Sequence, residues 1–318
     1  MSTEKQIYDV LVAGELNVDI ILNKVNKFPS LGKEVLAGQM TITLGSSSGI
    51  FASNLSVLGT KVTFAGTLAR DEFGKQIITS LRAKGVDTEN IVYVTEQSTG
   101  ASIAISFQEE RAMVTFPGAM SLFSLQNVSD NLLRASRHLH VSSIFLSTGL
   151  KKDVHKLFRQ AKAFGLTTSL DPQWDPEERW DIDFKSLLPH VDVFIPNENE
   201  LRAMTGIQDI RQAADALRGY ANILIVKCGR DGATLYKGDD VIYQPAFLND
   251  EVVDSIGAGD SFCAGFIHQF IQGKSLKECL AFAALTGAIN TTRAGGTTAF
   301  ENLAGVKAIA ESSFNYKI

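Results

Sequence analysis

Short apolar runs that alternate with amphipathic stretches constrain the fold of this 318-residue chain more than any other feature. Most runs are followed within a few residues by apolar side chains at helical spacing, and a glycine often stands where the helix should end. We expect strands at 8–13, 61–65, 139–143, 167–170, 191–195 and 222–226, and helices at 73–84, 152–164, 198–205 and 210–220. This alternation predicts a mostly parallel sheet covered by helices on both faces. Because such sheets bind ligands beyond the carboxyl ends of their strands, residues that follow a strand are the first candidates for a site.

Two segments, 20–43 and 91–115, are extended in pattern and lack a helical period. The second holds two apolar runs, 100–107 and 111–116, joined by a pair of glutamates, and this arrangement predicts a hairpin. We therefore expect a small antiparallel sheet, called the lid below, formed by roughly 16–44 and 91–117 of a single domain spanning 1–318. Its strand edges favour pairing with a second copy, which predicts a homodimer through the lid.

Composition excludes several classes of function. The formal net charge is −5 with a pI near 5.6, and no basic stripe offers a surface for nucleic acid. Charges and glycines interrupt the apolar runs before they reach membrane-spanning length, so we expect no membrane insertion. The first ten residues lack the apolar core of a signal peptide, which predicts a cytoplasmic protein. The three cysteines show no metal-binding or redox spacing and are expected to be structural.

The most informative stretch is 254–267, which reads DSIGAGDSFCAGFI. Its small residues, Gly257, Ala258 and Gly259, precede an apolar helical run at 261–271. Small residues let backbone N–H groups approach an anion, and the start of a helix adds its positive dipole end. Such a turn suits a phosphoryl group, and Asp260 beside it is placed to accept the proton of an attacking hydroxyl. The same spacing also fits a plain turn before a core helix, with Asp260 as a first-turn residue.

This segment resembles the second signature of the ribokinase/PfkB carbohydrate kinases, DTxGAGDxFxxG. Ser255 replaces the threonine, and the matching residues are Asp254, Gly257, Ala258, Gly259, Asp260, Phe262 and Gly265. The resemblance implies a ribokinase-like α/β fold and transfer of the γ-phosphoryl group of ATP to a hydroxyl of a sugar or sugar derivative. It makes Asp260 the catalytic base and Gly257, Ala258 and Gly259 the anion hole, and it implies Mg²⁺ as a cofactor.

Two further elements follow the order of that family. Asn17 and Asp19 lie in Gly-Glu-Leu-Asn-Val-Asp after the first strand and resemble the GxxNxD element, which implies contacts with substrate hydroxyls. Without the family they describe a polar exit from a strand. Asn197 and Glu200 resemble the NxxE element, which implies Mg²⁺ held through water. The same pair also fits a helix capping box, and the two roles are compatible.

The nucleotide side is indicated by residues 226–232, which resemble the VTxGxxG loop beside ATP. Gly229 and Gly232 permit the tight turn, while Lys227 replaces the threonine and either reaches a phosphate or lies at the surface. Asn290 lies in a segment, 288–296, that resembles the border of the adenine pocket. A K⁺ site near Asp254 is a further possibility that the residues leave open.

The first family signature, GGxxxN, is altered. Gly45 is kept, but Ser46 replaces the second glycine and Ile50 stands at the asparagine position, so a polar substrate contact is lost or moved to 46–48. Two other residues are candidates for the substrate pocket. Asp171 lies in DPQW, a variant of the family's DPNxR element, and Arg111 on the expected hairpin fits either a substrate anion or solvent.

Two competing functions remain at this point. A nucleoside kinase of the same fold would use Ile50 and Phe51 as an apolar surface for a base, and activity on adenosine but on no free sugar would favour it. A non-catalytic sugar- or nucleotide-sensing protein is the other, since a fold alone does not establish activity. The retained base, anion hole and Asn197–Glu200 pair argue against this second alternative.

Overall fold

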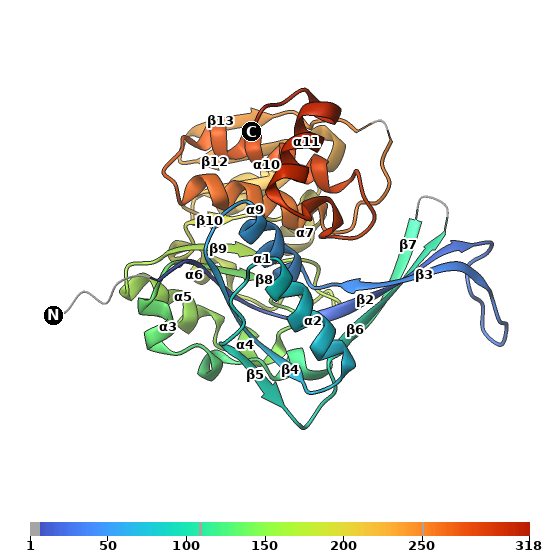
Figure 1. Ribbon diagram of the computed structural model, residues 1–318. Helices are drawn as coiled ribbons and strands as arrows, with labels where there is room; N and C mark the ends of the chain where they lie inside the picture. The colour runs from blue at the N-terminus through green and yellow to red at the C-terminus, as the bar shows by residue number, and fades with distance from the viewer. Residues whose placement is uncertain (1–6, 108–109, 250) are drawn as a thin grey trace.

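The structure is a computed structural model that describes residues 7–107, 110–249 and 251–318. It consists of a large α/β body and a small sheet that projects from it (Figure 1). Within the described residues the body holds a nine-stranded sheet, in the order β13-β12-β11-β10-β9-β8-β1-β4-β5. The strands are β1 (Tyr8–Ala13), β4 (Val62–Ala69), β5 (Ile91–Val94), β8 (Ser136–Ser142), β9 (Thr167–Asp171), β10 (Val193–Phe194), β11 (Leu224–Lys227), β12 (Ala233–Lys237) and β13 (Asp240–Gln244).

The sheet is parallel from β5 through β11, and only β12 and β13 run antiparallel to their neighbours. Helices cover both of its faces. On one face lie α1 (Ser47–Val57), α2 (Glu72–Ala83), α9 (Ala258–Phe270) and α10 (Leu276–Asn290), with α11 (Leu303–Phe314) packed outside α10. On the other lie α3 (Asp130–Arg134), α4 (Thr148–Lys151), α5 (Val154–Ala163), α6 (Phe184–Leu187), α7 (Glu198–Thr205) and α8 (Ile210–Arg218).

Strand β1 shows why both faces must be covered. Val10 and Val12 belong to the core under α1 and α9, whereas Leu11 and Ala13 belong to the core under α5. All four side chains are fully buried, as expected for a central strand whose alternate residues point to opposite faces. The predicted α/β class, a mostly parallel sheet covered by helices on both faces, is confirmed. The expected helix at 152–164 corresponds to α5, and the short helix α4 that precedes it was not expected.

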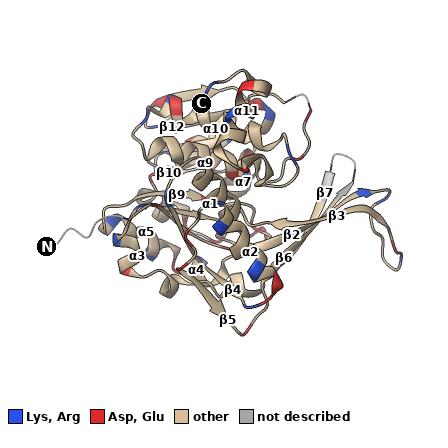
Figure 2. Ribbon diagram, viewed as in Figure 1, with Lys and Arg blue, Asp and Glu red and all other residues tan. Residues whose placement is uncertain are grey.

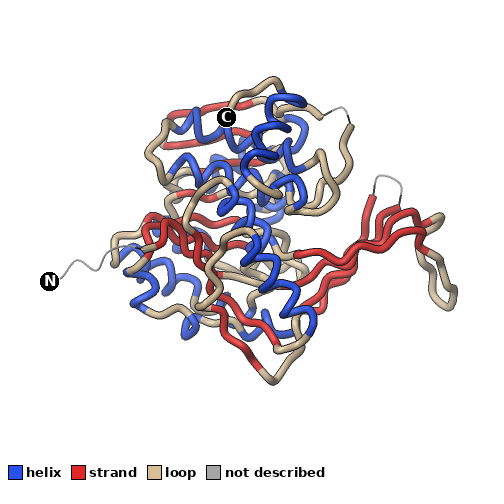
Figure 3. The backbone as a smooth tube through the Cα atoms, viewed as in Figure 1, coloured by secondary structure: helices blue, strands red, loops and turns tan. Residues whose placement is uncertain are grey.

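The lid is a four-stranded sheet that extends away from the body (Figure 3). Its order is β3-β2-β6-β7, with β2 (Asn17–Val25), β3 (Ala37–Leu44), β6 (Gly100–Phe107) and β7 (Glu110–Phe116). The β6–β7 hairpin forms as expected, but its turn at 108–109 lies outside the described residues. Two expectations were wrong. Strands β2 and β6 pair parallel, and residues 91–94 form β5, which pairs with β4 in the body.

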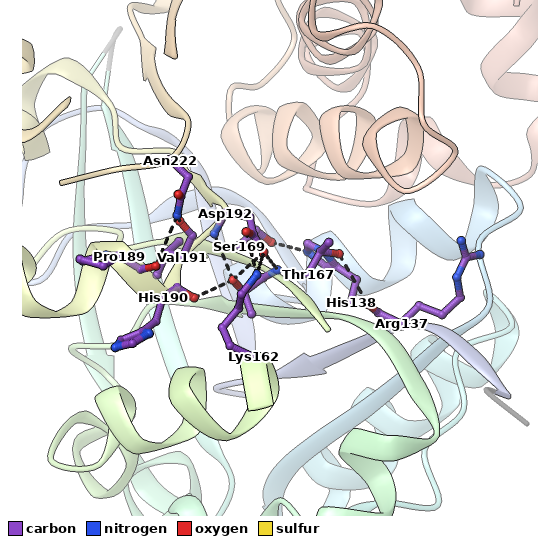
Figure 4. Close-up of polar contacts among 11 residues, drawn as sticks. Arg137, His138, Lys162, Thr167, Ser169, Pro189, His190, Val191, Asp192 and Asn222 are labelled. Atoms are coloured by element: carbon purple, nitrogen blue, oxygen red, sulfur yellow. Dashed lines mark hydrogen bonds and ion pairs between the residues drawn. The ribbon is translucent and has the colours of Figure 1, made fainter. Parts of the chain in front are cut away.

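The amino ends of β8, β9 and β10 are closed by polar contacts (Figure 4). Both carboxylate oxygens of Asp192 accept from Nζ of Lys162 at 2.8 Å, and Oδ2 also accepts the backbone N–H of Thr168. Nδ2 of Asn222 donates to the carbonyl of Val191 at 2.8 Å. These contacts hold the starts of the strands together and satisfy the hydrogen-bonding groups there. We therefore expect a ligand site at the opposite edge of the sheet, where the strands end.

Lys and Arg are interspersed with Asp and Glu over both parts of the ribbon in Figure 2. Of the helices in the described residues, none combines the length and apolar character needed to cross a bilayer.

Candidate active site

The turn before α9 lies at the carboxyl-end edge of the sheet and begins the site. Gly257 has φ 76°, and a Cβ on it would lie 2.6 Å from Cα of Gly296, so only glycine fits. It caps α9 without a side chain, which leaves first-turn N–H groups for a ligand. Asp260 follows in that first turn and is 7% exposed. The structure therefore places the Asp260 carboxylate directly beside the turn at 257–259.

A buried amide network holds this turn from behind. Nδ2 of Asn54 donates to Oγ of Ser261 and to the carbonyl of Gly296, both at 2.9 Å. Oγ of Ser261 donates to Oδ1 of Asn290 at 3.0 Å, and Nδ2 of Asn290 donates to the carbonyl of Ile256. Asn290 is fully buried, so the structure places it under the turn and not in the lining of the cavity beside Lys227, although we expected it to contact the nucleotide. Asn54 and Ser261 escaped the sequence analysis because only packing brings them together.

The environment of Asp260 favours its protonated form. Burial raises the pKa of its carboxyl to about 7, and the nearby negative charge of Asp171 acts in the same direction. The positive charge of Lys227 and a hydrogen bond from Ser47 oppose the shift. A carboxyl with a pKa near neutrality is well matched to accepting a proton at physiological pH. The electrostatics therefore agree with the role of a general base.

Asp171 ends β9 next to Asp260 and is the centre of a charged cluster. Its Oδ2 lies 2.7 Å from Nζ of Lys227 and accepts from Gln173 at 3.1 Å and from the thiol of Cys263 at 3.2 Å. Its Oδ1 has no hydrogen-bond partner among the described residues and is buried. Burial alone would lower the pKa of Lys227, but the charge and hydrogen bond of Asp171, together with the charges of Cys263 and Glu200, outweigh burial and raise that pKa. Lys227 is thus a buried cation, 11% exposed, and does not lie at the surface.

The residues that we expected to contact the substrate hydroxyl come together at the base of the lid. Asn17 and Asp19, on β2, are 3% and 5% exposed, and Nδ2 of Asn17 donates to Oδ1 of Asp19 at 3.0 Å. Asn17 also donates to Oγ of Ser102 on β6. A Cβ on Gly45 would lie 2.2 Å from Oδ1 of Asp19, which explains why this first glycine of the signature is kept. Asp19 is close enough to Asp260 that its charge raises the pKa of the latter.

Sequence reasoning missed Glu15, which lies between these elements. Its carboxylate accepts from the backbone N–H of Ser48 at 3.2 Å and from the hydroxyls of Ser46 and Ser48 at the start of α1. Burial raises the pKa of Glu15 to about 7, and hydrogen bonds from Ser48 partly offset this. Ser46 has φ 68°, a conformation suited to the glycine that it replaces. The signal available in the sequence was a carboxylate two residues after a buried strand.

Ile50 and Phe51 do not provide a surface for a nucleobase. Ile50 is 2% exposed and packs against Gly296, where an added Cβ would lie 2.3 Å from Cδ1 of Ile50. Phe51 is 1% exposed and stacks on His140 with ring centroids 3.6 Å apart. Both side chains are buried in the core beneath the turn at 257–259. The interpretation in which they form an apolar surface for the base of a nucleoside was therefore wrong, because almost the whole start of α1 is buried.

Asn197 and Glu200 lie at the start of α7, after β10. They form a reciprocal capping box, in which Asn197 N donates to Oε2 of Glu200 at 2.8 Å and Glu200 N donates to Oδ1 of Asn197 at 2.9 Å. Burial raises the pKa of Glu200 to about 7, opposed by Lys227. Because both side chains already bind each other, they suit Mg²⁺ only through water. The described residues contain no cluster of three acidic, His or Cys ligands.

A cavity of ≈ 1090 Å³ adjoins the turn on its other side. The predicted loop residues Lys227, Gly229 and Gly232 line it, together with Ala258 and Gly259 of the turn. A Cβ on Gly259 would lie 3.6 Å from Nζ of Lys227, so the ammonium lies next to the turn. Further lining comes from Lys24 of the lid, from Phe247 and Val253 between β13 and α9, and from Phe262 and Ala288 on α9 and α10. The volume and the mostly apolar lining suit a nucleotide.

Arg111 lies on β7, opposite Ser106 of β6. Its side chain is outside the described part of the structure, so its role as a substrate contact stays a prediction.

Comparison with known proteins agrees with this arrangement. The chain belongs to the pfkB family of carbohydrate kinases, whose model matches residues 8–303. A deoxyribokinase of Salmonella typhi is 27% identical over 93% of this chain and 96% of its own. A putative ribokinase II of E. coli, solved in complex with ATP and Mg²⁺, has TM-score 0.84 at 24% identity and covers 96% of this chain and 99% of its own. An adenosine kinase of Sinorhizobium meliloti has TM-score 0.80 at 24% identity, covering 91% and 95%.

Proposed function

We propose that the protein transfers the γ-phosphoryl group of ATP to a hydroxyl of a sugar or sugar derivative, with Asp260 as the general base. The observation that carries the proposal is the position of Asp260 in the first turn of α9, between the anion-binding turn and the acceptor residues on β2. The acceptor hydroxyl gives its proton to Asp260 while its oxygen attacks the γ-phosphorus, and ADP leaves on the opposite side. The turn at 257–259 stabilises the charge that grows on the phosphoryl oxygens.

Binding of the two substrates is divided between the two sides of the turn. ATP occupies the cavity beside Lys227, Gly229 and Gly232, with its terminal phosphate at the turn. The acceptor lies against Asn17 and Asp19, with Asp171 at the end of β9 nearby. Asn197 and Glu200 would hold Mg²⁺ through water, and the ion would supply charge neutralisation for the phosphates. The K⁺ site stays a prediction, with the Asp254 carboxylate bound to the N–H groups of Ile256 and Gly295.

The experiment is release of ADP from Mg-ATP with a panel of pentoses, hexoses, sugar acids, sugar phosphates and nucleosides. We expect turnover on a sugar class, and a loss of at least ~100-fold in kcat for Asp260→Asn with the fold retained. Because the base must be deprotonated, the rate should rise with pH through about 7. Turnover undiminished in Asp260→Asn would remove Asp260 from this role. Turnover on adenosine alone would favour a nucleoside kinase, and no turnover on any compound would overturn the proposal.

The lid also supports a proposed homodimer. Its inner face carries Asp19 and Ile21, which are buried against the body. Its outer face carries a cross-strand row in which Ile42, Ile103 and Val114 are 38%, 40% and 68% exposed. An apolar row of this kind is suited to burial against a second lid. Sedimentation at micromolar concentration should show a dimer that Val114→Lys dissociates, and a wild-type monomer would end this part of the proposal.

A further inference from the structure

Gln173 makes a bridge that neither the fold nor the family signatures assign. Its Nε2 lies 3.1 Å from Oδ1 of Asp260 and 3.1 Å from Oδ2 of Asp171. Oδ2 of Asp171 is ion-paired with Lys227 and can only accept hydrogen bonds, so the amide nitrogen of Gln173 and not its oxygen must face it. The nitrogen carries two hydrogens, and the two carboxylates use both. The amide of Gln173 thereby fixes one oxygen of each acid.

The backbone at Gln173 is held in an unusual conformation. Its φ is 58°, in the left-handed region that non-glycine residues rarely adopt. The following loop is ordered by Asp175, whose carboxylate accepts the N–H groups of Glu177, Arg179 and Trp180. Trp174 packs edge-to-face on Trp180 with ring centroids 5.3 Å apart. The segment 171–180, DPQWDPEERW, is thus a loop ordered by its own hydrogen bonds and ring packing, and it places the side-chain amide of Gln173 against Asp260.

The charges around Asp260 explain why such an amide is needed. The negative charges of Asp171 on β9 and Asp19 on β2 both raise the pKa of Asp260. Glu15, after β1, and Glu200 on α7 also interact with its charge. Lys227 on β11 is the cation that opposes them, and its Nζ is bound to Asp171. A donor between two carboxylates weakens their repulsion and favours the ionised form of Asp260.

We propose that Gln173 is the positioning residue of the catalytic base: its side-chain amide holds Oδ1 of Asp260 and Oδ2 of Asp171 together, so that Oδ2 of Asp260 is the oxygen that meets the acceptor hydroxyl. The inference rests on the proposed function for the meaning of the base, but the hydrogen bond itself is tested without turnover. Gln173 touches no reacting atom in this scheme. It acts by orienting Asp260 and by keeping it ionised.

The test is a pH titration of the protein labelled with ¹³C at the aspartate carboxyl carbons, in which the Asp260 signal is identified by its absence in Asp260→Asn. In wild type we expect a midpoint of about 7. Gln173→Met keeps the length of the side chain but removes the donor, so the midpoint should rise by about one unit. The matched control is Gln212→Met on α8, whose side chain is exposed and should leave the midpoint unchanged.

Gln173→Asn separates the amide from the backbone. Asparagine accepts a left-handed φ, but its amide is one methylene shorter. If reach of the amide matters, this variant behaves like Gln173→Met in the titration. In turnover assays both variants should lower kcat about tenfold and raise the pH below which kcat falls. KM for ATP should stay within about twofold of the wild-type value. An unmoved Asp260 midpoint in Gln173→Met would overturn the inference, as would wild-type behaviour of Gln173→Asn. Failure of wild type to phosphorylate any acceptor would instead count against the proposed function, while the titration still decides the role of Gln173.

Discussion

Nζ of Lys227 lies 2.7 Å from Oδ2 of Asp171, and the two side chains are only 11% and 1% exposed. The pair joins the end of β11, beside the cavity proposed for ATP, to the end of β9, near the residues proposed to bind the phosphoryl acceptor. The lysine stands where a threonine is usual in the resembling family element. A buried ion pair of this kind gives little net stability against an apolar replacement, but breaking it from one side is costly because a charge remains buried.

Lys227→Met should therefore destabilise the fold by about 3 kcal/mol, since it leaves the Asp171 carboxylate buried without its cation. Adding Asp171→Asn should recover much of this loss, so that the two effects are strongly non-additive in a double-mutant cycle. Denaturant unfolding of wild type, the two single variants and the double variant measures this coupling energy. As a control, Lys156→Met breaks an ion pair with Asp153 whose side chains are 69% and 35% exposed, and should cost less than about 1 kcal/mol. Equal losses at both sites would contradict the burial argument.

Gly45→Ala should weaken binding of the phosphoryl acceptor and leave binding of ATP unchanged. The added Cβ would lie 2.2 Å from Oδ1 of Asp19 and 2.8 Å from Nδ2 of Asn17, so both side chains must shift. We expect KM for the acceptor to rise at least ~10-fold, by loss of about 1.4 kcal/mol of binding, with ATP affinity retained. Gly219→Ala is the control, because nothing lies within 4 Å of its added Cβ. An equal change in ATP affinity would show that the substitution disturbs the whole site.

Glu15 should make stability depend on pH. Its folded pKa is raised from 4.5 to about 7, chiefly by burial, so the folded state holds its proton more tightly than the unfolded chain. The stability from this group is fully present below pH 4.5 and is lost as pH rises toward 7, by about 3 kcal/mol in all. Glu15→Gln removes the ionisation, so its stability relative to wild type should increase from pH 5 to pH 8. Parallel unfolding curves of the two proteins across that range would contradict this assignment.

Much of the site was predictable because its residues follow strands. Asp171 and Asn197 come directly after expected strands, and the carboxyl ends of parallel strands meet at one edge of a sheet. The family signatures then supplied the roles. What the pattern does not contain is which face of a wholly buried helix a residue occupies. For that reason Ile50 and Phe51 were considered as a surface for a base in the nucleoside-kinase alternative, and Asn290 was expected at the nucleotide, although all three lie in the interior.

The lid shows a second limit of sequence reasoning. Extended segments were recognised from the missing helical period, but pairing between distant strands has no local signal. The parallel contact of β2 with β6 joins residues about eighty positions apart, and it sets Asn17 beside Ser102. Gln173 was noted only as a departure from the DPNxR element. Its contact with Asp260, 87 positions away, depends on the full topology.

Ser46 offers a test of how the altered first signature is tolerated. Its φ of 68° strains any residue with a Cβ, yet its Oγ accepts the N–H of Gly49 at 2.8 Å and donates to the carbonyl of Glu15 at 2.6 Å. Ser46→Ala keeps the strain and loses the cap, so unfolding free energy should fall by about 1–2 kcal/mol. Ser46→Gly loses the cap but relieves strain of order 1–3 kcal/mol, so it should lie near wild type or above it. Denaturant midpoints of the two variants measure the difference. Alanine and glycine with equal losses would mean that the hydroxyl alone matters and that the backbone at this position carries no strain.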